Sequence, residues 1–231
     1  MGAATLGARV SDDPRATVAG SLGVFGGTFD PIHVAHLAVA EEAAEALGLE
    51  RVLFVPAGRP PNKPGVEITA GHHRLAMVEL AIAGNPRFAV SRLELDRDGP
   101  SFTVDTLATL AAEREAAGVP SDGLHLVLSA EAFLGLPTWH EPRRVLELAR
   151  MVVSPRDGYP DVGPAALASW FPDRPDLAGR AVFLDGPRLH LSASALRDRV
   201  AAGRSLRYLV PDAVRAYIGD HALYRTRRRI P

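Results

Sequence analysis

The sequence contains no cysteine, and this absence excludes several kinds of chemistry at once. Disulfide bonds, thiolate metal sites and a cysteine nucleophile all require a thiol. A reducing cytoplasm is the easiest compartment for such a chain, so we expect a cytoplasmic protein. Long apolar runs are missing as well, since none approaches the roughly 20 residues that span a bilayer. We therefore expect no membrane partner.

A strong charge of either sign is also missing. The formal net charge is −1, so nothing electrostatic favours nucleic acid, and we predict none as a partner. The one basic cluster, residues 225–229, is most simply a solvated tail. The first twenty residues lack the basic head and apolar run of a secretory signal, and their small and polar residues predict a flexible tail.

The 231 residues are 47% apolar and 23% charged, which is typical of a globular protein with a real core. Short apolar runs alternate with helical patterns along the chain. We expect strands at 22–26, 51–56, 87–95, 124–128, 151–153 and 181–184. We expect helices at 31–47, from Thr69 to about Ala83, at 101–117, around 143–149 and Trp170, and from Ser194 and Pro211.

This alternation predicts βαβ units and a doubly wound, Rossmann-like, mostly parallel sheet, with helices at the C-terminal end. We expect a flexible tail over 1–20, a single folded domain over 21–225 and a basic tail over 226–231. Ligands of such sheets bind beyond the carboxyl ends of the strands, so residues that follow strands are the first candidates for a site.

The most informative segment runs from Gly26 to His36 and reads Gly-Gly-Thr-Phe-Asp-Pro-Ile-His-Val-Ala-His. Paired glycines let the backbone approach a ligand closely. Pro31 is suited to the start of a helix, whose free N–H groups and partial positive charge favour phosphate. His33 and His36 are three residues apart, so both imidazoles face the same side and can donate hydrogen bonds to phosphate oxygens.

Two other interpretations of this segment stay open. A glycine pair can be an ordinary turn, and single histidines are common in folded proteins. A His-x-x-His pair can also bind a metal ion. No third ligand is evident nearby, so we predict no metal site made by the protein itself.

A second candidate follows the last expected strand, in Leu-Ser-Ala-Ser-Ala-Leu-Arg from Leu191 to Arg197. Ser192 or Ser194 is a good helix N-cap, and Arg197 would lie about one turn into the helix. A hydroxyl, free N–H groups and a guanidinium would then converge on one anion. Taken alone, the segment is also compatible with a capped surface helix.

Together the two segments resemble the signatures of the nucleotidyltransferase superfamily. The first resembles Gly-Gly-Thr-Phe-Asp-Pro-x-His-x-Gly-His, with Ala35 in place of the last glycine. The second resembles Ile-Ser-Ser/Thr-Thr-x-x-Arg, which holds the ATP triphosphate in that superfamily, with Ser194 in place of threonine. By this resemblance residues 21–225 form a nucleotidyltransferase domain.

Within the superfamily, residues 22–224 resemble bacterial nicotinate-mononucleotide adenylyltransferases. The middle of the chain carries this likeness. The matching segments are Pro60-Pro61-Asn62-Lys63, Ser101-Phe102-Thr103-Val104-Asp105-Thr106-Leu107, Leu136-Pro137-Thr138-Trp139-His140 and Tyr208-Leu209-Val210-Pro211, followed by Tyr217-Ile218 and residues 221–224.

The resemblance implies adenylyl transfer from ATP to nicotinate mononucleotide, giving nicotinate adenine dinucleotide and pyrophosphate in NAD biosynthesis, with Mg²⁺ brought by ATP. The expected catalytic residues are His33, His36 and Arg197. The expected ATP and phosphate ligands are Gly26, Gly27, Thr28, Phe29, Ser192, Ser194 and Lys63. The expected mononucleotide ligands are Thr103, Trp139, Ser129 and Glu131, with Trp139 stacked on the nicotinate ring and Thr103 near its carboxylate.

One departure from the family concerns Ser129-Ala130-Glu131, where the family has Gly-Ala-Asp. The added side chain at Ser129 and the longer Glu131 can alter substrate preference or rate. Another acceptor, such as nicotinamide mononucleotide or a phosphopantetheine-like phosphate, therefore stays open. So do a nucleotide-binding sensor without turnover and a homo-oligomer.

Overall fold

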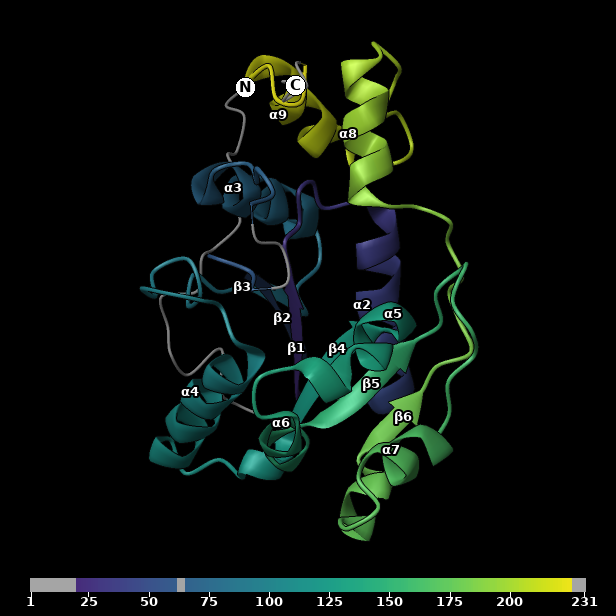
Figure 1. Ribbon diagram of the computed structural model, residues 1–231. Helices are drawn as coiled ribbons and strands as arrows, with labels where there is room; N and C mark the ends of the chain where they lie inside the picture. The colour runs from purple at the N-terminus through teal and green to yellow at the C-terminus, as the bar shows by residue number, and fades with distance from the viewer. Residues whose placement is uncertain (1–19, 62–64, 226–231) are drawn as a thin grey trace.

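Figure 1 shows the computed structural model of the chain, which describes residues 20–61 and 65–225. The expected tails lie almost entirely outside these residues, and Lys63 also lies outside them.

Among the described residues, six strands form one sheet in which every pairing is parallel. The strands are β1 (Leu22–Gly27), β2 (Arg51–Pro56), β3 (Phe88–Val90), β4 (Leu124–Ser129), β5 (Arg150–Ser154) and β6 (Ala181–Phe183). Their order is β3-β2-β1-β4-β5-β6. The chain thus runs outward in one direction from β1 and then in the other from β4, which confirms the doubly wound, Rossmann-like class.

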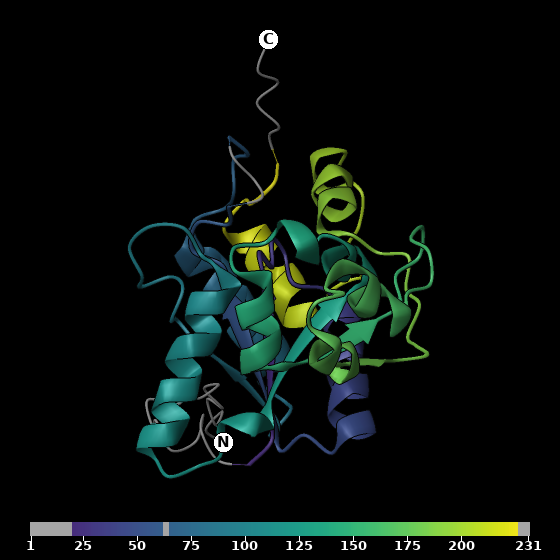
Figure 2. The same cartoon turned by 60° about the horizontal axis from the view of Figure 1, so that its bottom comes forward.

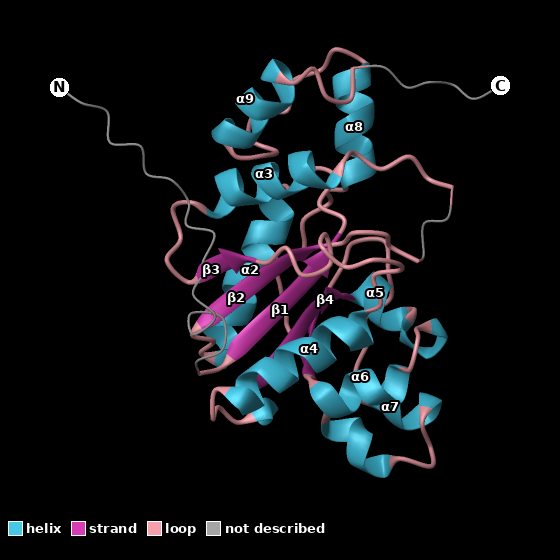
Figure 3. Ribbon diagram, turned by 90° about the vertical axis from the view of Figure 1, so that its left-hand side faces the viewer, coloured by secondary structure: helices cyan, strands magenta, loops and turns pink. Residues whose placement is uncertain are grey.

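Helices cover both faces of this sheet (Figures 2 and 3). One face packs against α4 (Thr103–Ala116), α5 (Ala130–Leu134), α6 (Pro142–Leu148) and α7 (Ala165–Trp170). The other face packs against α2 (Val34–Leu47), α3 (Gly71–Ile82), α8 (Ala193–Ala201) and α9 (Asp212–Asp220). Short 3₁₀ turns occupy Ser121–Gly123, Leu136–Thr138 and Pro175–Gly179. No helix in the described part of the chain is long and apolar enough to cross a membrane.

The continuous apolar runs of the sequence follow from this three-layer arrangement. In β2, Leu53 and Val55 belong to the core on the α4 side, whereas Val52 and Phe54 belong to the core on the α2 side. Successive side chains of a strand point to opposite faces, so a strand buried on both faces needs apolar residues at every position.

Several expected elements differ from the structure. The strand expected over 87–95 ends at Val90, because the chain then turns and Asp96 N–H donates to the carbonyl of Arg92. The first helix begins at Val34, three residues after Pro31. Thr69 does not cap α3, whose N-cap is Ala70. The backbone N–H of Thr69 donates to the carboxylate of Asp30. The short helix α5 was not predicted.

Candidate functional site

The order of the strands brings two loops together at one edge of the sheet. β1 and β4 are hydrogen-bonded neighbours, and the chain leaves their carboxyl ends toward α2 and α5. The segment from Gly26 to His36 follows β1, and Ser129 ends β4. This is the topological switch point at which doubly wound sheets bind ligands.

The two histidines of the first loop form a stacked pair. His33 is the N-cap of α2, and its backbone N–H donates to Nδ1 of His36 over 3.2 Å. The two ring centroids are 3.7 Å apart, and the ring planes differ by 15°. Phe29, at a φ of +48°, places its ring edge-to-face with His36 at 5.1 Å. The imidazoles therefore lie together at the helix start, although the helix begins later than Pro31.

His33 is neutral at physiological pH. The residue is only 4% exposed, and burial lowers the pKa of its imidazole to about 4, with a further lowering by the charge of Arg156. Among the residues that the structure describes, none forms a hydrogen bond with Nδ1 of His33. A buried polar atom without a partner costs free energy, so this nitrogen suits a ligand or water that completes the bond.

Buried polar residues that sequence reasoning gave no role hold this loop in place. The carboxylate of Asp30 accepts hydrogen bonds from the N–H of Thr69 at 3.2 Å and from the hydroxyl of Tyr224 at 2.7 Å. The guanidinium of Arg74, 2% exposed, donates to the carbonyls of Thr28 and Thr69, each at 2.8 Å. No pattern in the sequence distinguishes Arg74 from an ordinary surface arginine of a helix.

The second phosphate-binding candidate lies against the first. Ser192 is the N-cap of α8, and its hydroxyl accepts a hydrogen bond from the N–H of Ala195 at 3.2 Å. Arg197 donates to the hydroxyl of Ser194 at 3.2 Å and to the backbone carbonyl of Asp30 at 2.6 Å. The start of α8 lies close to the start of α2 in Figure 1. Two segments 167 residues apart thus form adjacent walls of one site.

The residues expected around the mononucleotide come from two neighbouring segments. Thr103 is the first residue of α4, and Trp139 follows the 3₁₀ turn Leu136–Thr138. Phe102 and His140, which adjoin them, pack ring against ring at 4.4 Å. Trp139 is partly buried against the α4-side core.

Ser129 and Glu131 have different partners. The Ser129 hydroxyl caps α5 by accepting a hydrogen bond from the N–H of Ala132 at 3.3 Å. Glu131 forms an ion pair with Nε of Arg156 at 2.9 Å. Arg156 follows β5 and was not among the predicted site residues, because a single arginine in a turn carries no signal in the sequence.

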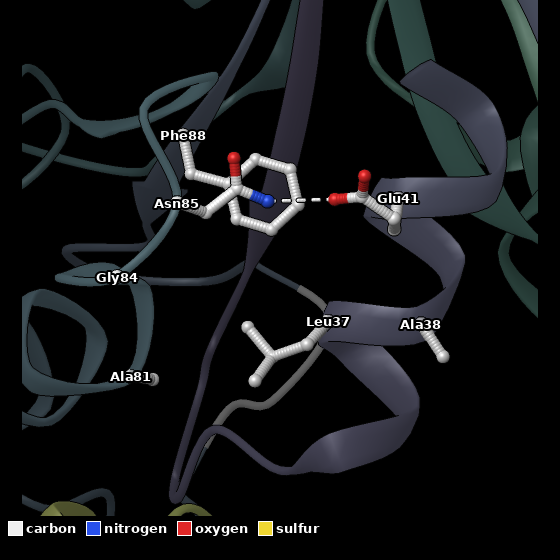
Figure 4. Close-up of a pocket in the computed structure, with 7 residues that line it drawn as sticks. All are labelled: Leu37, Ala38, Glu41, Ala81, Gly84, Asn85 and Phe88. Carbon is white, nitrogen blue, oxygen red and sulfur yellow. Dashed lines mark hydrogen bonds between the residues drawn. The ribbon is translucent and has the colours of Figure 1, made fainter. Parts of the chain in front are cut away.

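A shallow pocket between α2 and the turn before β3, lined in part by Leu37, Glu41 and Phe88, contains none of the predicted site residues (Figure 4). Within 20–61 and 65–225, no group of three or more His, Cys, Asp or Glu residues is arranged to hold a metal ion.

Comparison with known proteins gives consistent matches over this whole region. The model of the cytidylyltransferase-like family matches residues 24–199. A "Probable nicotinate-nucleotide adenylyltransferase" of Roseiflexus sp. (strain RS-1) is 50% identical over 204 residues, which is 88% of this chain and 98% of the relative. A protein of the same name from Thermus thermophilus is 44% identical over 206 residues, covering 88% of this chain and 99% of the relative.

Solved structures show the same fold. Two structures of the Plasmodium falciparum nicotinic acid mononucleotide adenylyltransferase, one complexed with APC and one with NaAD, superpose with TM-scores of 0.69 and 0.70. Each is 17% identical in sequence and covers 89% of this chain and 98% of its own.

Proposed function

The chain belongs to the cytidylyltransferase-like family and, within it, to the nicotinate-nucleotide adenylyltransferases, and we propose that its site joins the adenylyl group of ATP to nicotinate mononucleotide. The reaction gives nicotinate adenine dinucleotide and pyrophosphate and belongs to NAD biosynthesis. The structural observation that carries the proposal is the hydrogen bond from Arg197 to the carbonyl of Asp30, because it joins the two phosphate-binding candidates into one site.

The reaction requires no nucleophile from the protein. An oxygen of the mononucleotide 5′-phosphate forms a bond to the α-phosphorus of ATP. The bond from that phosphorus to the oxygen bridging it to the β-phosphorus breaks, and this oxygen leaves in pyrophosphate with the bonding electron pair. Catalysis then consists of holding the two phosphates in line and stabilising charge on the equatorial oxygens.

The two phosphate-binding segments, 26–36 and 191–197, have separate roles in this proposal. His33, His36 and the backbone from Gly26 to Phe29 bind the transferring phosphate and the adjoining phosphates of ATP. Ser192, Ser194, Arg197 and the start of α8 bind the β- and γ-phosphates. A neutral His33 donates a hydrogen bond to a phosphate oxygen from one ring nitrogen.

The acceptor binds beside α4 and the 3₁₀ turn that precedes Trp139. An electron-poor pyridinium ring stacked on an indole gains on the order of 1 kcal/mol. Thr103, at the start of α4, holds the ring carboxylate, and Lys63, Ser129 and Glu131 complete the expected contacts. Of these residues, Lys63 lies outside the described part of the chain.

Mg²⁺ enters with ATP as part of the substrate. Hard oxygen ligands suit this ion, and phosphate oxygens and water supply most of them in nucleotide sites. We further propose that residues 21–225 act as one domain, that the enzyme works in the cytoplasm and that it needs no nucleic acid.

The proposal is tested by measuring pyrophosphate release from ATP and Mg²⁺ with three acceptors in separate reactions: nicotinate mononucleotide, nicotinamide mononucleotide and phosphopantetheine. We expect the highest kcat/KM with nicotinate mononucleotide. His36→Ala serves as the control for contaminating activity and should lower kcat by roughly 100-fold or more. A higher kcat/KM with another acceptor would reassign the substrate. ATP binding without pyrophosphate release from any acceptor would instead indicate a nucleotide sensor.

A further inference from the structure

A tight turn after β5 fixes the position of Arg156. The N–H of Tyr159 donates to the carbonyl of Arg156 at 3.1 Å, and Gly158 has a φ of +83°. A positive φ at the third position of a four-residue turn is the reason for glycine there. The guanidinium of Arg156 lies over the ring of Tyr159, 6.0 Å from its centroid.

Glu131 connects this turn to the loop after β4. Its carboxylate pairs with Nε of Arg156 at 2.9 Å, and hydrogen bonding to the same carboxylate raises the pKa of Tyr159. The Arg156 side chain is 36% exposed and that of Glu131 is 46% exposed, so the pair lies at the surface of the switch point rather than in the core. A half-exposed pair of this kind contributes little to stability by itself.

The terminal nitrogens of Arg156 are available to a ligand. Within the described residues, Arg156 is ion-paired with Glu131, whose carboxylate contacts Nε. No described residue accepts a hydrogen bond from Nη1 or Nη2 of Arg156. Arg156 is also close enough to His33 for its charge to lower the pKa of that imidazole. The nearby Nδ1 of His33 is buried without a partner among the described residues. An arginine fork and an unpartnered imidazole nitrogen together suit a phosphate oxygen.

We propose that Arg156 is a further catalytic residue, which binds the transferring phosphate together with His33, and that Glu131 is a positioning residue for Arg156. This inference rests on the proposed function. During transfer, the Arg156 guanidinium stabilises the charge on the equatorial oxygens while the bond to the leaving pyrophosphate breaks. Glu131 holds the guanidinium in place before substrate binds, in addition to the mononucleotide contact given in the proposed function.

The length of the Glu131 side chain matters to this arrangement. The ion pair connects loops that follow two neighbouring strands, and glutamate reaches one methylene further than aspartate. The contact with Glu131 is at Nε, and a guanidinium has five N–H donors, so Glu131 can orient Arg156 without occupying all its donors.

The test compares the kinetics of full-length variants with ATP, Mg²⁺ and nicotinate mononucleotide. Arg156→Gln should lower kcat by roughly 100-fold, as loss of one charge-stabilising donor does in other enzymes, and Arg156→Lys should retain part of the activity. Glu131→Gln should lower kcat about tenfold. Because Glu131 acts through Arg156, the double variant should be no slower than Arg156→Gln alone.

Arg174→Gln is the matched control. Arg174 is 33% exposed and also ion-paired, with Glu147 and Asp176, but it precedes the amino end of β6. Its loss should leave kcat within about twofold of the parent. Wild-type turnover in Arg156→Gln would overturn the catalytic role. If kcat of the double variant falls by the product of the two single effects, the positioning role of Glu131 is overturned.

A binding measurement separates failure of this inference from failure of the proposed function. Inorganic triphosphate, titrated by calorimetry, should bind at least tenfold more weakly to Arg156→Gln than to the parent or to Arg174→Gln. The parent protein could release no pyrophosphate and still bind triphosphate at least tenfold more tightly than Arg156→Gln does. In that case the proposed function fails and the phosphate contact of Arg156 stands. Equal binding by all three proteins would overturn the contact.

Discussion

His33 shows how the environment of one residue decides its chemistry. The sequence places this histidine beside a helix start, but only the fold makes it 4% exposed and gives it a pKa of about 4. A neutral imidazole binds phosphate by donating a hydrogen bond from one nitrogen, and it does not hold the ion through charge. We therefore expect phosphate binding to raise the pKa of His33, since the anion favours the protonated form.

The buried His33 should make the protein less stable in acid. Its pKa is lower in the folded state than the ordinary value of 6.5, so the unfolded state binds more protons between pH 6.5 and about 4. The stability that depends on neutral His33 is complete above pH 6.5 and falls as the pH decreases to about 4. The difference amounts to roughly 3 kcal/mol by proton linkage.

Urea denaturation of the parent and of His33→Gln between pH 7 and pH 4 measures this effect. The glutamine variant lacks the titrating group, so its free energy of unfolding should fall less across the range. Other titrating groups contribute equally to both proteins and cancel in the comparison. Parallel pH profiles for the two proteins would show that His33 is not protected from protonation.

Trp139 is the second residue whose role can be tested alone. Trp139→Ala should raise KM for nicotinate mononucleotide about fivefold or more, because the stacking energy of roughly 1 kcal/mol is lost, while KM for ATP stays near its parent value. Trp139 also packs against the core, so Trp139→Phe is the control that keeps an aromatic ring and the fold. An effect confined to ATP would contradict this assignment.

At the scale of elements, the C-terminal segment acts as a support for the first loop. α9 packs on α3, and Tyr224, four residues after the end of α9, donates to Asp30 at 2.7 Å. Asp30 in turn precedes the stacked histidines. The last helix of the domain is therefore coupled to the phosphate-binding loop through one hydroxyl.

Tyr224→Phe should reduce both stability and turnover. Removing the donor leaves the buried Asp30 carboxylate with one partner fewer and costs about 1–3 kcal/mol. Tyr217→Phe is a close control, because Tyr217 lies on α9 and its hydroxyl contacts Nδ1 of His73 at 2.9 Å, away from Asp30. We expect kcat to fall several-fold in the first variant and to change less than twofold in the second. Equal effects on kcat would contradict the coupling.

Element boundaries show where local patterns stop being informative. The pattern that predicted a strand over 87–95 continues past Val90, but β3 ends there, because the chain turns and the N–H of Asp96 donates to the carbonyl of Arg92. Thr69 has the chemistry of a helix cap, yet α3 begins one residue later, with Ala70 as its N-cap, and the N–H of Thr69 donates to Asp30, 39 residues away. Neither boundary was evident in the local pattern of apolar and polar residues.

At the scale of the whole molecule, the sheet order determines which loops meet. Hydrophobic patterns predicted the strands and the parallel class, but they contain no information on the order β3-β2-β1-β4-β5-β6. The meeting of segments 26–36 and 191–197 was predictable only through the resemblance of two motifs, and the contact between Asp30 and Arg197 was not predicted. The roles of Arg74 and Arg156 were not predictable, because each depends on neighbours that the fold alone supplies.

A crystal structure with an unreactive ATP analogue shows whether both motifs bind one triphosphate. We expect the α-phosphate within hydrogen-bond distance of His33 or His36, and the terminal phosphates at Arg197 and the first N–H groups of α8. A triphosphate that contacts only one of the two motifs would rule out a shared phosphate site.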